Sequence, residues 1–353
     1  MARLQSLHLH YFRNHFDVKV DLDEDIVVIV GDNGQGKTSL VEAAYLMATG
    51  TSFRADRAEE MVSFDQELAR VTAKLSTDDT LEVIVTRGMV QGKRTQARLF
   101  SVNQVRRRRK DFIGYLSAVV FRPEDMRLME GSPSRRRTFM DSALIQSHPS
   151  YAVSLTTYEQ ALLRRNKILQ AVREREMPVT VLTYWNNLII KHGQVIQDAR
   201  TRFLDSFSTT EFPVAFEVTY VPSLMSAERL AEYQPREIAA GHTLIGPHKD
   251  DFEVKFQWRP GQAWQTVSTY GSRGQQRMAV LWLKLAELSY LKTTNDQLPL
   301  LLLDDIFSEL DHEVRGLVMQ LMTAQQTIVT TTESQVAADL ERELPKVQIL
   351  TLE

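Results

Sequence analysis

The chain has 353 residues, with 42 Lys or Arg against 45 Asp or Glu and a formal net charge of −3 at pH 7. Hydrophobic residues make up 43% and charged residues 25%, a globular composition that excludes collagen-like and disordered chains, and the length suggests about two domains. The absence of cysteine excludes disulfides and thiol chemistry. No apolar run approaches the roughly 18 residues of a membrane helix, and the N-terminus is too polar for a signal peptide. We therefore expect a cytoplasmic protein that contacts no membrane.

The first third of the sequence has the patterns of strands. Residues 26–30 form a continuous apolar run that ends in a glycine-rich turn, which is typical of a central parallel strand. The alternation of apolar and polar residues predicts further strands at 4–9, 69–73, 81–86 and 97–102, and a second apolar run, closed by Pro123, predicts one at 118–121.

The middle of the chain has long helical patterns, from 134 to about 208. The last third predicts a helix from about Gln275 and strands at 298–303 and 327–331. The simplest assembly is an α/β lobe made of 1–133 and 240–353, into which a mainly helical lobe of 134–239 is inserted.

A phosphate-binding motif follows the apolar strand. The sequence GDNGQGKTS matches G-x-x-x-x-G-K-[ST] between a predicted strand and a predicted helix. Backbone N–H groups and the helix N-terminus would surround phosphates, Lys37 would neutralise β- and γ-oxygens, and the Thr38 hydroxyl would coordinate Mg²⁺. The predicted nucleotide-binding residues are Gly31, Asp32, Asn33, Gly34, Gln35, Gly36, Lys37, Thr38 and Ser39.

Two carboxylates follow the apolar strand near residue 300. At the end of this strand, Asp304 would hold Mg²⁺ together with Thr38, and Asp305 would orient or deprotonate the attacking water, so that Lys37 and Asp305 are the predicted catalytic residues. No guanine-specifying N-K-x-D pattern is present, which favours ATP over GTP.

A third motif, S-R-G-Q, lies at the start of the helix predicted from Gln275. Ser272, Gly274 and Gln275 resemble the S-x-G-Q signature of ABC-type ATPases, in the Q-Q-R variant of the chromosome-maintenance (SMC) and DNA-repair branch. Residues 308–311, ending in Asp311, resemble the D-loop of that class. This resemblance implies that the signature closes over ATP held by a second subunit, in an ATP-dependent head-to-tail homodimer, with Asp311 also near nucleotide.

The whole chain resembles the RecF family of recombination-repair proteins. The segments that carry this resemblance are YFRNH (11–15), the run 123–141, GPHKDDF (246–252) and LLDDIFSELD (302–311). Only 235 residues separate Lys37 from Ser272, which leaves no room for the long coiled-coil arms of SMC proteins. The expected fold class is an α/β ABC-type P-loop ATPase head with mixed sheets, helices and an inserted α-helical lobe.

The sequence departs from this class around the expected water. Residues 121–124 read F-R-P-E where many heads have a Q-loop glutamine, Asp305 stands for the usual glutamate, and threonines 330–332 stand for the switch histidine. Val314 stands where the family usually has a base. A loosely held water predicts slow hydrolysis, so that ATP acts as a switch.

The resemblance implies DNA binding to double-stranded or gapped DNA, an RecR-type mediator as partner, and RecA loading in recombinational repair. No sequence-reading DNA motif is present, so contacts to the phosphate backbone are expected. Two other classes stay open: a nucleotide-binding subunit of another assembly, transport or SMC-like, and a nucleotide kinase. The candidate DNA-binding residues are Lys93, Arg94, Arg106, Arg107, Arg108, Arg109 and Lys110.

Overall fold

The computed structural model describes residues 2–310 and 312–352 and divides the chain into two compact units. The first unit consists of Met1–Met126 and Glu287–Glu353, and the second of Arg127–Ala286. The second unit thus holds more than the helical segment 134–239, since it also takes the strands near residue 255 and most of a later helix. The lobe boundaries expected from the sequence stay a prediction.

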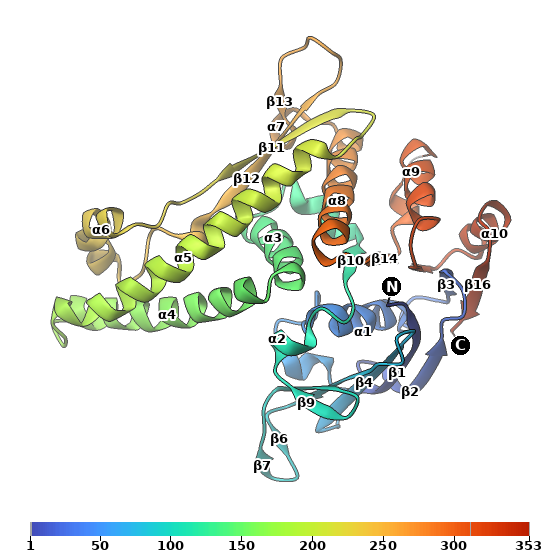
Figure 1. Cartoon of the computed structure of the whole chain (residues 1–353), viewed down its shortest axis with the longest axis horizontal. Helices are drawn as coiled ribbons and strands as arrows, with labels where there is room; N and C mark the ends of the chain where they lie inside the picture. The colour runs from blue at the N-terminus through green and yellow to red at the C-terminus, as the bar shows by residue number, and fades with distance from the viewer. Residues whose placement is uncertain (1, 311, 353) are drawn as a thin grey trace. The chain divides into compact units, whose positions relative to one another are not determined.

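A parallel sheet forms one layer of the first unit (Figure 1). Its strand order is β10-β14-β15-β3-β16, and all its neighbouring strands run parallel, so that their carboxyl ends meet at one edge. Every residue of β3, β14 and β15 is buried, which explains the near-continuous apolar sequences of β3 and β14. The strands are β3 (Ile26–Val30), β10 (Ala118–Phe121), β14 (Leu300–Asp304), β15 (Thr327–Thr331) and β16 (Val347–Thr351).

An antiparallel sheet forms the other layer, in the order β2-β1-β4-β5-β8-β9. Apolar side chains alternate along β4 and β5, so that one face of this sheet is buried and the other is solvated. Its strands are β1 (Leu4–Phe12), β2 (His15–Asp21), β4 (Leu68–Leu75), β5 (Thr80–Thr86), β8 (Arg98–Val102) and β9 (Val105–Arg107).

Helix α1 (Lys37–Thr49) lies between the two sheets and contacts strands of both. All its residues except Thr38 are buried, and its apolar side chains join one core cluster with both sheets. Full burial of one Leu or Val stabilises the fold by about 1.5–3 kcal/mol, so this packing fixes the start of α1 against the ends of the parallel strands.

Shorter elements complete the first unit. Exposed loops carry a small hairpin, β6 and β7, while α2 contacts β8, and α10 contacts β3, β15 and β16. Their bounds are β6 (Met89–Val90), β7 (Lys93–Arg94), α2 (Arg109–Phe112), α9 (His312–Met322) and α10 (Ser334–Glu343).

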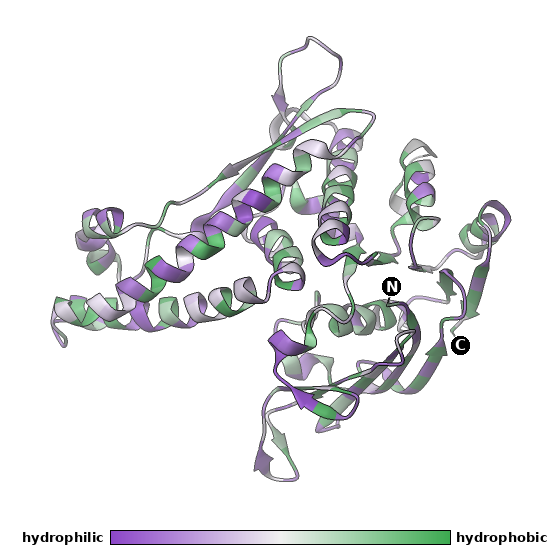
Figure 2. Ribbon diagram, viewed as in Figure 1, coloured by the Kyte–Doolittle hydropathy of each residue, from purple (hydrophilic) through white to green (hydrophobic). Residues whose placement is uncertain are grey.

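The second unit combines long helices with a three-stranded antiparallel sheet. Helices α4 and α5 lie side by side, and green and purple alternate along α5 in Figure 2, as expected for an amphipathic helix. The elements are α3 (Pro133–Ser147), α4 (Pro149–Arg173), α5 (Leu182–Asp205), β11 (Ala215–Val221), α6 (Ala227–Ala240), β12 (Asp251–Gln257), β13 (Gln265–Thr266), α7 (Val267–Tyr270) and α8 (Arg273–Asn295), whose last residues belong to the first unit. Over residues 2–310 and 312–352, no helix is both long and apolar enough to cross a bilayer.

Candidate nucleotide site

The glycine-rich loop joins β3 to α1 and curls around the Lys37 side chain. The Lys37 ammonium donates to the carbonyl oxygens of Gly31 at 2.6 Å and Asp32 at 2.9 Å, and the residue is only 7% exposed. Gly34 and Gly36 have φ values of +90° and +95°, a left-handed backbone that favours glycine. The loop therefore holds one cation at the N-terminus of a buried helix, where an anion is stabilised.

The turn between β1 and β2 supports this loop from behind. Asn14 donates its amide to the Gly34 carbonyl at 2.9 Å and accepts from the Ser39 hydroxyl at 3.1 Å, and His15 Nε2 lies 3.0 Å from the Gly36 carbonyl. A Cβ on Gly36 would lie 2.4 Å from His15 Nε2, which gives a second reason for glycine there. Sequence reasoning identified this turn only by resemblance and assigned it no function.

Arg13 of the same turn forms a buried ion pair with helix α1. Its guanidinium donates to both carboxylate oxygens of Glu42, at 2.9 and 2.7 Å, and to the carbonyl of Glu60 at 2.6 Å. Glu42 is fully buried, and such a paired, bidentate contact fixes the orientation of both partners.

Asp304 ends β14 directly beneath Thr38. Its Oδ1 accepts hydrogen bonds from the hydroxyls of Thr38 at 2.9 Å and Thr330 at 2.8 Å. Burial raises the pKa of the Asp304 carboxyl above its ordinary value; the two hydroxyl donors oppose this effect, and the nearby carboxylates of Glu124 and Asp305 add to it. A hydroxyl beside a buried carboxylate in a cluster of negative charges is a donor set that fits Mg²⁺.

Asp305 follows with a left-handed backbone, φ +51°. Its N–H donates to both the carbonyl and the hydroxyl oxygen of Thr330, at 3.1 Å each, and the residue is half-buried. These bonds to β15 fix the backbone from which the Asp305 side chain extends at the edge of the sheet.

The loop, the turn and Asp305 line a cavity of about 610 Å³. This volume is within the range of ligand sites, about 300–1,000 Å³. Among the predicted residues of the loop 31–39, Gly31, Asp32 and Gln35 lie outside this lining. The Gln35 side chain accepts from the Asp32 N–H, and the carbonyl oxygens of Gly31 and Asp32 accept from Lys37. The lining residues are Arg13, Asn14, Asn33, Gly34, Gly36, Lys37, Thr38, Ser39, Arg54, Glu60, Val62, Phe64 and Asp305.

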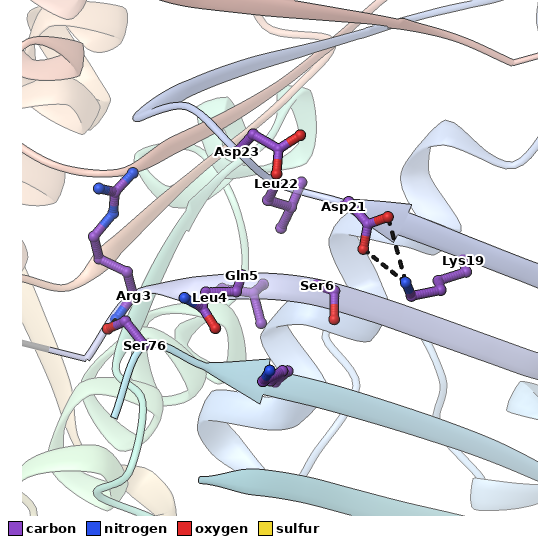
Figure 3. Close-up of a pocket in the computed structure, with 10 residues that line it drawn as sticks. Arg3, Leu4, Gln5, Ser6, Lys19, Asp21, Leu22, Asp23 and Ser76 are labelled. Atoms are coloured by element: carbon purple, nitrogen blue, oxygen red, sulfur yellow. Dashed lines mark hydrogen bonds and ion pairs between the residues drawn. The ribbon is translucent and has the colours of Figure 1, made fainter. Parts of the chain in front are cut away.

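A second cavity in the first unit, of about 360 Å³, lies at the start of β1 (Figure 3). Two of its basic side chains form ion pairs: Lys19 with Asp21 at 3.0 Å, and Arg3 with Asp25 at 2.6 Å. Because its lining mixes charges of both signs, this cavity gives no indication of a particular ligand.

The predicted signature residues begin helix α8 and form a capping box. The Gln275 N–H donates to Ser272 Oγ at 3.3 Å, and Gln275 Oε1 accepts from the Ser272 N–H at 2.8 Å. Ser272 is exposed, and a Cβ on Gly274 would meet no atom within 4 Å. Nothing within the described chain therefore requires glycine at position 274. Asp311, the predicted D-loop residue, lies outside the described residues.

A family model described as the RecF/RecN/SMC N terminal domain matches residues 3–349. The DNA replication and repair protein RecF of Oceanobacillus iheyensis is 31% identical, and the match covers 93% of this chain and 93% of the relative. The chain belongs to the RecF family.

Solved structures agree with the RecF assignment. The chain is similar to a structure titled as the recombination mediator protein RecF-ATPrS in the RecFOR pathway, with a TM-score of 0.84, 25% identity, and coverage of 94% of this chain and 93% of that one. An Smc head domain derived from Pyrococcus furiosus shares the fold at 16% identity, with a TM-score of 0.50 and coverage of 96% and 92%. These comparisons confirm the predicted fold class, an ABC-type ATPase head.

Two segments that carried the RecF resemblance meet inside the second unit. Arg136, from the run 123–141, donates to both carboxylate oxygens of Asp251, with the closer contact at 2.5 Å. Arg200 on α5 is 2% exposed and donates to Asp141 and Asp250, at 2.8 and 2.9 Å. Because a buried guanidinium needs such carboxylates, these segments form an internal ion-pair network.

Arg137 belongs to the same network, since its guanidinium donates to the Asp250 carbonyl at 2.9 Å. Arg136 and Arg137 belong to a run of three arginines in the sequence, a pattern for which packing, nucleotide binding and DNA binding are all alternatives. Both side chains bind acidic residues or carbonyls of their own unit, which favours packing.

The basic runs divide into exposed and bonded residues. Arg109 is half-buried and donates to the carbonyl of Thr49, the last residue of α1, at 2.9 and 3.2 Å. A cation there offsets the negative end of the helix dipole, so Arg109 has a structural role. Arg106 donates to Gln96 but stays exposed. The remaining candidates are exposed on β7, β9 and the start of α2: Lys93, Arg94, Arg107, Arg108 and Lys110.

Proposed function

We propose that this RecF-family chain is an ATP-dependent DNA-binding clamp. ATP and Mg²⁺ bind at the loop of residues 31–39, and a second copy closes over the nucleotide through Ser272, Gly274 and Gln275. The closed homodimer holds double-stranded or gapped DNA and acts with an RecR-type mediator in RecA loading during recombinational repair. The segment 134–239 is its inserted lobe, and Asp311 contributes to the closed site.

The observation that carries this proposal is that the phosphate-binding groups and the signature belong to different parts of the chain. The first unit brings together the cation, hydroxyl and carboxylates that phosphoryl chemistry needs. Lys37, Thr38 and Asp305 line the cavity, and Asp304 accepts from the Thr38 hydroxyl. The signature presents an exposed serine, Ser272, and a glycine, Gly274, at which a Cβ would meet no atom of the described residues within 4 Å. A glycine is needed where another backbone or a ligand approaches closely, and ATP on a second copy supplies that ligand.

Each group at the loop has a defined chemical task. The Lys37 ammonium neutralises the β- and γ-phosphate oxygens, and the loop N–H groups bind them. Mg²⁺, held by Thr38 and Asp304, would stabilise the charge that develops on those oxygens. Asp305 orients the attacking water and accepts its proton; because its side chain is one methylene shorter than the usual glutamate, hydrolysis is slow.

The exposed residues of the basic runs bind DNA. Lysine and arginine bind the phosphate backbone without reading sequence, which agrees with the lack of a base-reading motif. Arg106, Arg107 and Arg108 lie at the edge strand β9 and the segment after it, where a duplex has open access.

Sedimentation tests the proposal directly. The purified chain is mixed with a duplex that contains a single-stranded gap, without nucleotide, with ADP, and with ATP plus Mg²⁺. A dimer on DNA only with ATP is expected, and Gly274→Glu, which places bulk and charge on the signature, should prevent it while leaving ATP binding by the monomer intact. An ATP-dependent dimer that ignores DNA would favour the alternative, a nucleotide-binding subunit of another assembly. A chain that stays monomeric with ATP would contradict the clamp.

A further inference from the structure

We propose that this chain has two exposed surfaces that form an interface in the ATP-bound dimer. One surface lies beside the nucleotide cavity and the other beside the signature, and the first surface of one copy binds the second surface of the other copy. The inference rests on the proposed ATP-dependent pairing and adds the contact that determines which surfaces meet. The first surface, the acidic rim, is residues 56–67 with Phe64. The second, the aromatic hairpin, is residues 258–270 with Trp258, Trp264 and Tyr270.

The acidic rim presents an aromatic side chain to solvent on a hydrogen-bonded turn. Phe64 lines the nucleotide cavity, yet it is 88% exposed. The turn that carries it is held in place: the Ser63 hydroxyl donates to the Arg13 carbonyl at 2.6 Å, and Arg87 donates to the Gln66 carbonyl at 2.8 Å. A large apolar side chain that a hydrogen-bonded turn presents to water favours a contact that buries it.

The aromatic hairpin is the counterpart on the signature side. Tyr270 is 66% exposed, Trp258 45% and Trp264 43%, and Tyr270 lies two residues before Ser272. Its position is defined as well, because α7 ends at Tyr270 and the Gly271 N–H donates to the Val267 carbonyl at 2.9 Å. Interface centres are enriched in Tyr and Trp of this kind.

The charges of the two surfaces are opposite. The acidic rim has five acidic residues and one basic residue, Arg57. The aromatic hairpin has one basic residue, Arg259, and no acidic residue. The wider stretch 254–286, which also contains the signature, has five basic residues and no acidic residue in a chain whose net charge is −3. Of these bases, Arg259 and Arg273 are exposed. A positive surface meets a negative one at favourable interfaces, and like charges exclude wrong pairings.

The positions of the two surfaces indicate that the partner of each is a second copy of this chain. The rim borders the cavity that holds the triphosphate, and the hairpin precedes the signature that would approach the triphosphate of another copy. When the signature of one copy reaches the cavity of the other, the hairpin of the first meets the rim of the second. A two-fold dimer contains this contact twice.

Paired variants test the contact in the full-length protein with ATP and Mg²⁺. The hairpin variant is Tyr270→Ala with Trp264→Ala, and the rim variant is Phe64→Ala with Asp65→Lys. Each alone should weaken dimerisation on the order of a hundredfold, because each contact loses a buried aromatic residue and occurs twice. Tyr184→Ala, which removes a tyrosine of similar exposure (64%) on α5, is the matched control and should dimerise as the parent does.

Mixing the two variants gives the decisive result. A heterodimer of hairpin variant and rim variant retains one contact in which both surfaces are intact, whereas neither homodimer retains any. The mixture should therefore form more dimer than either variant alone. Binding of a fluorescent ATP analogue by the monomeric hairpin variant should be unchanged, since none of its altered residues lines the cavity.

The outcomes separate this inference from the proposed function. If the parent chain does not dimerise with ATP, the proposed function fails. If the parent dimerises and the hairpin variant dimerises equally well, only this inference is overturned. A hairpin variant that dimerises normally but loses affinity for gapped DNA would assign the aromatic residues to base stacking instead and would also overturn it.

Discussion

His248 should make the second unit sensitive to mild acid. Its Nδ1 lies 2.8 Å from the Tyr158 hydroxyl, and its Nε2 lies 3.2 Å from the Thr243 carbonyl, a pair of partners that suits a neutral imidazole. Burial lowers the pKa of His248 from the ordinary 6.5 to about 4. The Thr243 carbonyl and Asp250 oppose this effect, while Lys249 and Arg137 add to it.

The sign follows from proton linkage. Between pH 6.5 and pH 4 the unfolded chain binds a proton at His248 that the folded chain does not, so stability falls as the pH falls. One pKa unit is worth about 1.4 kcal/mol. The free energy of unfolding should therefore drop by about 2 kcal/mol between pH 7.5 and pH 5, and by about 3 kcal/mol down to pH 4, through this residue alone.

Urea denaturation followed by tryptophan fluorescence measures this effect where it occurs. All four tryptophans lie in the second unit, at 185, 258, 264 and 282, so their emission reports on its unfolding. The His248→Gln variant should lose about 2 kcal/mol of the parent's pH dependence between pH 7.5 and pH 5, whatever its stability at neutral pH. His242→Gln, at an exposed position six residues earlier, should keep it. Parallel pH profiles for the parent and His248→Gln would refute the reasoning.

Three other substitutions test separate parts of the molecule. Gly36→Ala should abolish binding of a fluorescent ATP analogue, because the new Cβ would clash with His15 and the φ of residue 36 is +95°. The control is Gly114→Ala, which has the backbone strain alone, at φ +109° with open space around the Cβ, and should keep binding. Asp305→Asn should lower the rate of ATP hydrolysis on the order of a hundredfold and trap the ATP-bound dimer, and an unchanged rate of phosphate release would exclude a role for this carboxylate. Arg136→Lys loses the bidentate contact with Asp251 and should destabilise the second unit by roughly 3 kcal/mol in urea, a loss that a solvated arginine would not produce.

The nucleotide loop was predictable because its signal is local. An apolar run of five residues, a glycine-rich turn and a helix lie next to one another in the sequence, and they form β3, the loop and α1. The position of Asp304 beneath Thr38 was also predictable, since carboxyl ends of parallel strands share one edge and the two residues end or follow such strands. The roles of the signature residues and of Asp311 stay predictions.

The supports of the site were not predictable, because their partners are distant in sequence and their residue types are common in turns. Asn14 reaches Gly34 across 20 residues, and a turn asparagine looks the same whether it binds water or a phosphate loop. The basic runs show the same limit: Arg109 caps a helix that ends 60 residues earlier, while its neighbour Arg108 is exposed. A run of basic residues in the sequence does not show which of them is bonded within the protein and which is exposed.

Thr330 shows how one side chain contacts both Asp304 and Asp305. Its hydroxyl gives its single proton to Asp304 and accepts from the Asp305 N–H, so it has no proton left for a phosphate oxygen. Thr331 is buried and its hydroxyl accepts from the Glu333 N–H. We therefore expect Thr332, half-buried directly after β15, to be the threonine that takes the place of the switch histidine. Thr332→Ala should therefore slow ATP hydrolysis without changing ATP affinity. Thr330→Val should instead weaken the binding of ATP with Mg²⁺, because Asp304 and Asp305 lose their shared support. Equal effects of the two substitutions on both measurements would show that the threonines do not divide these tasks.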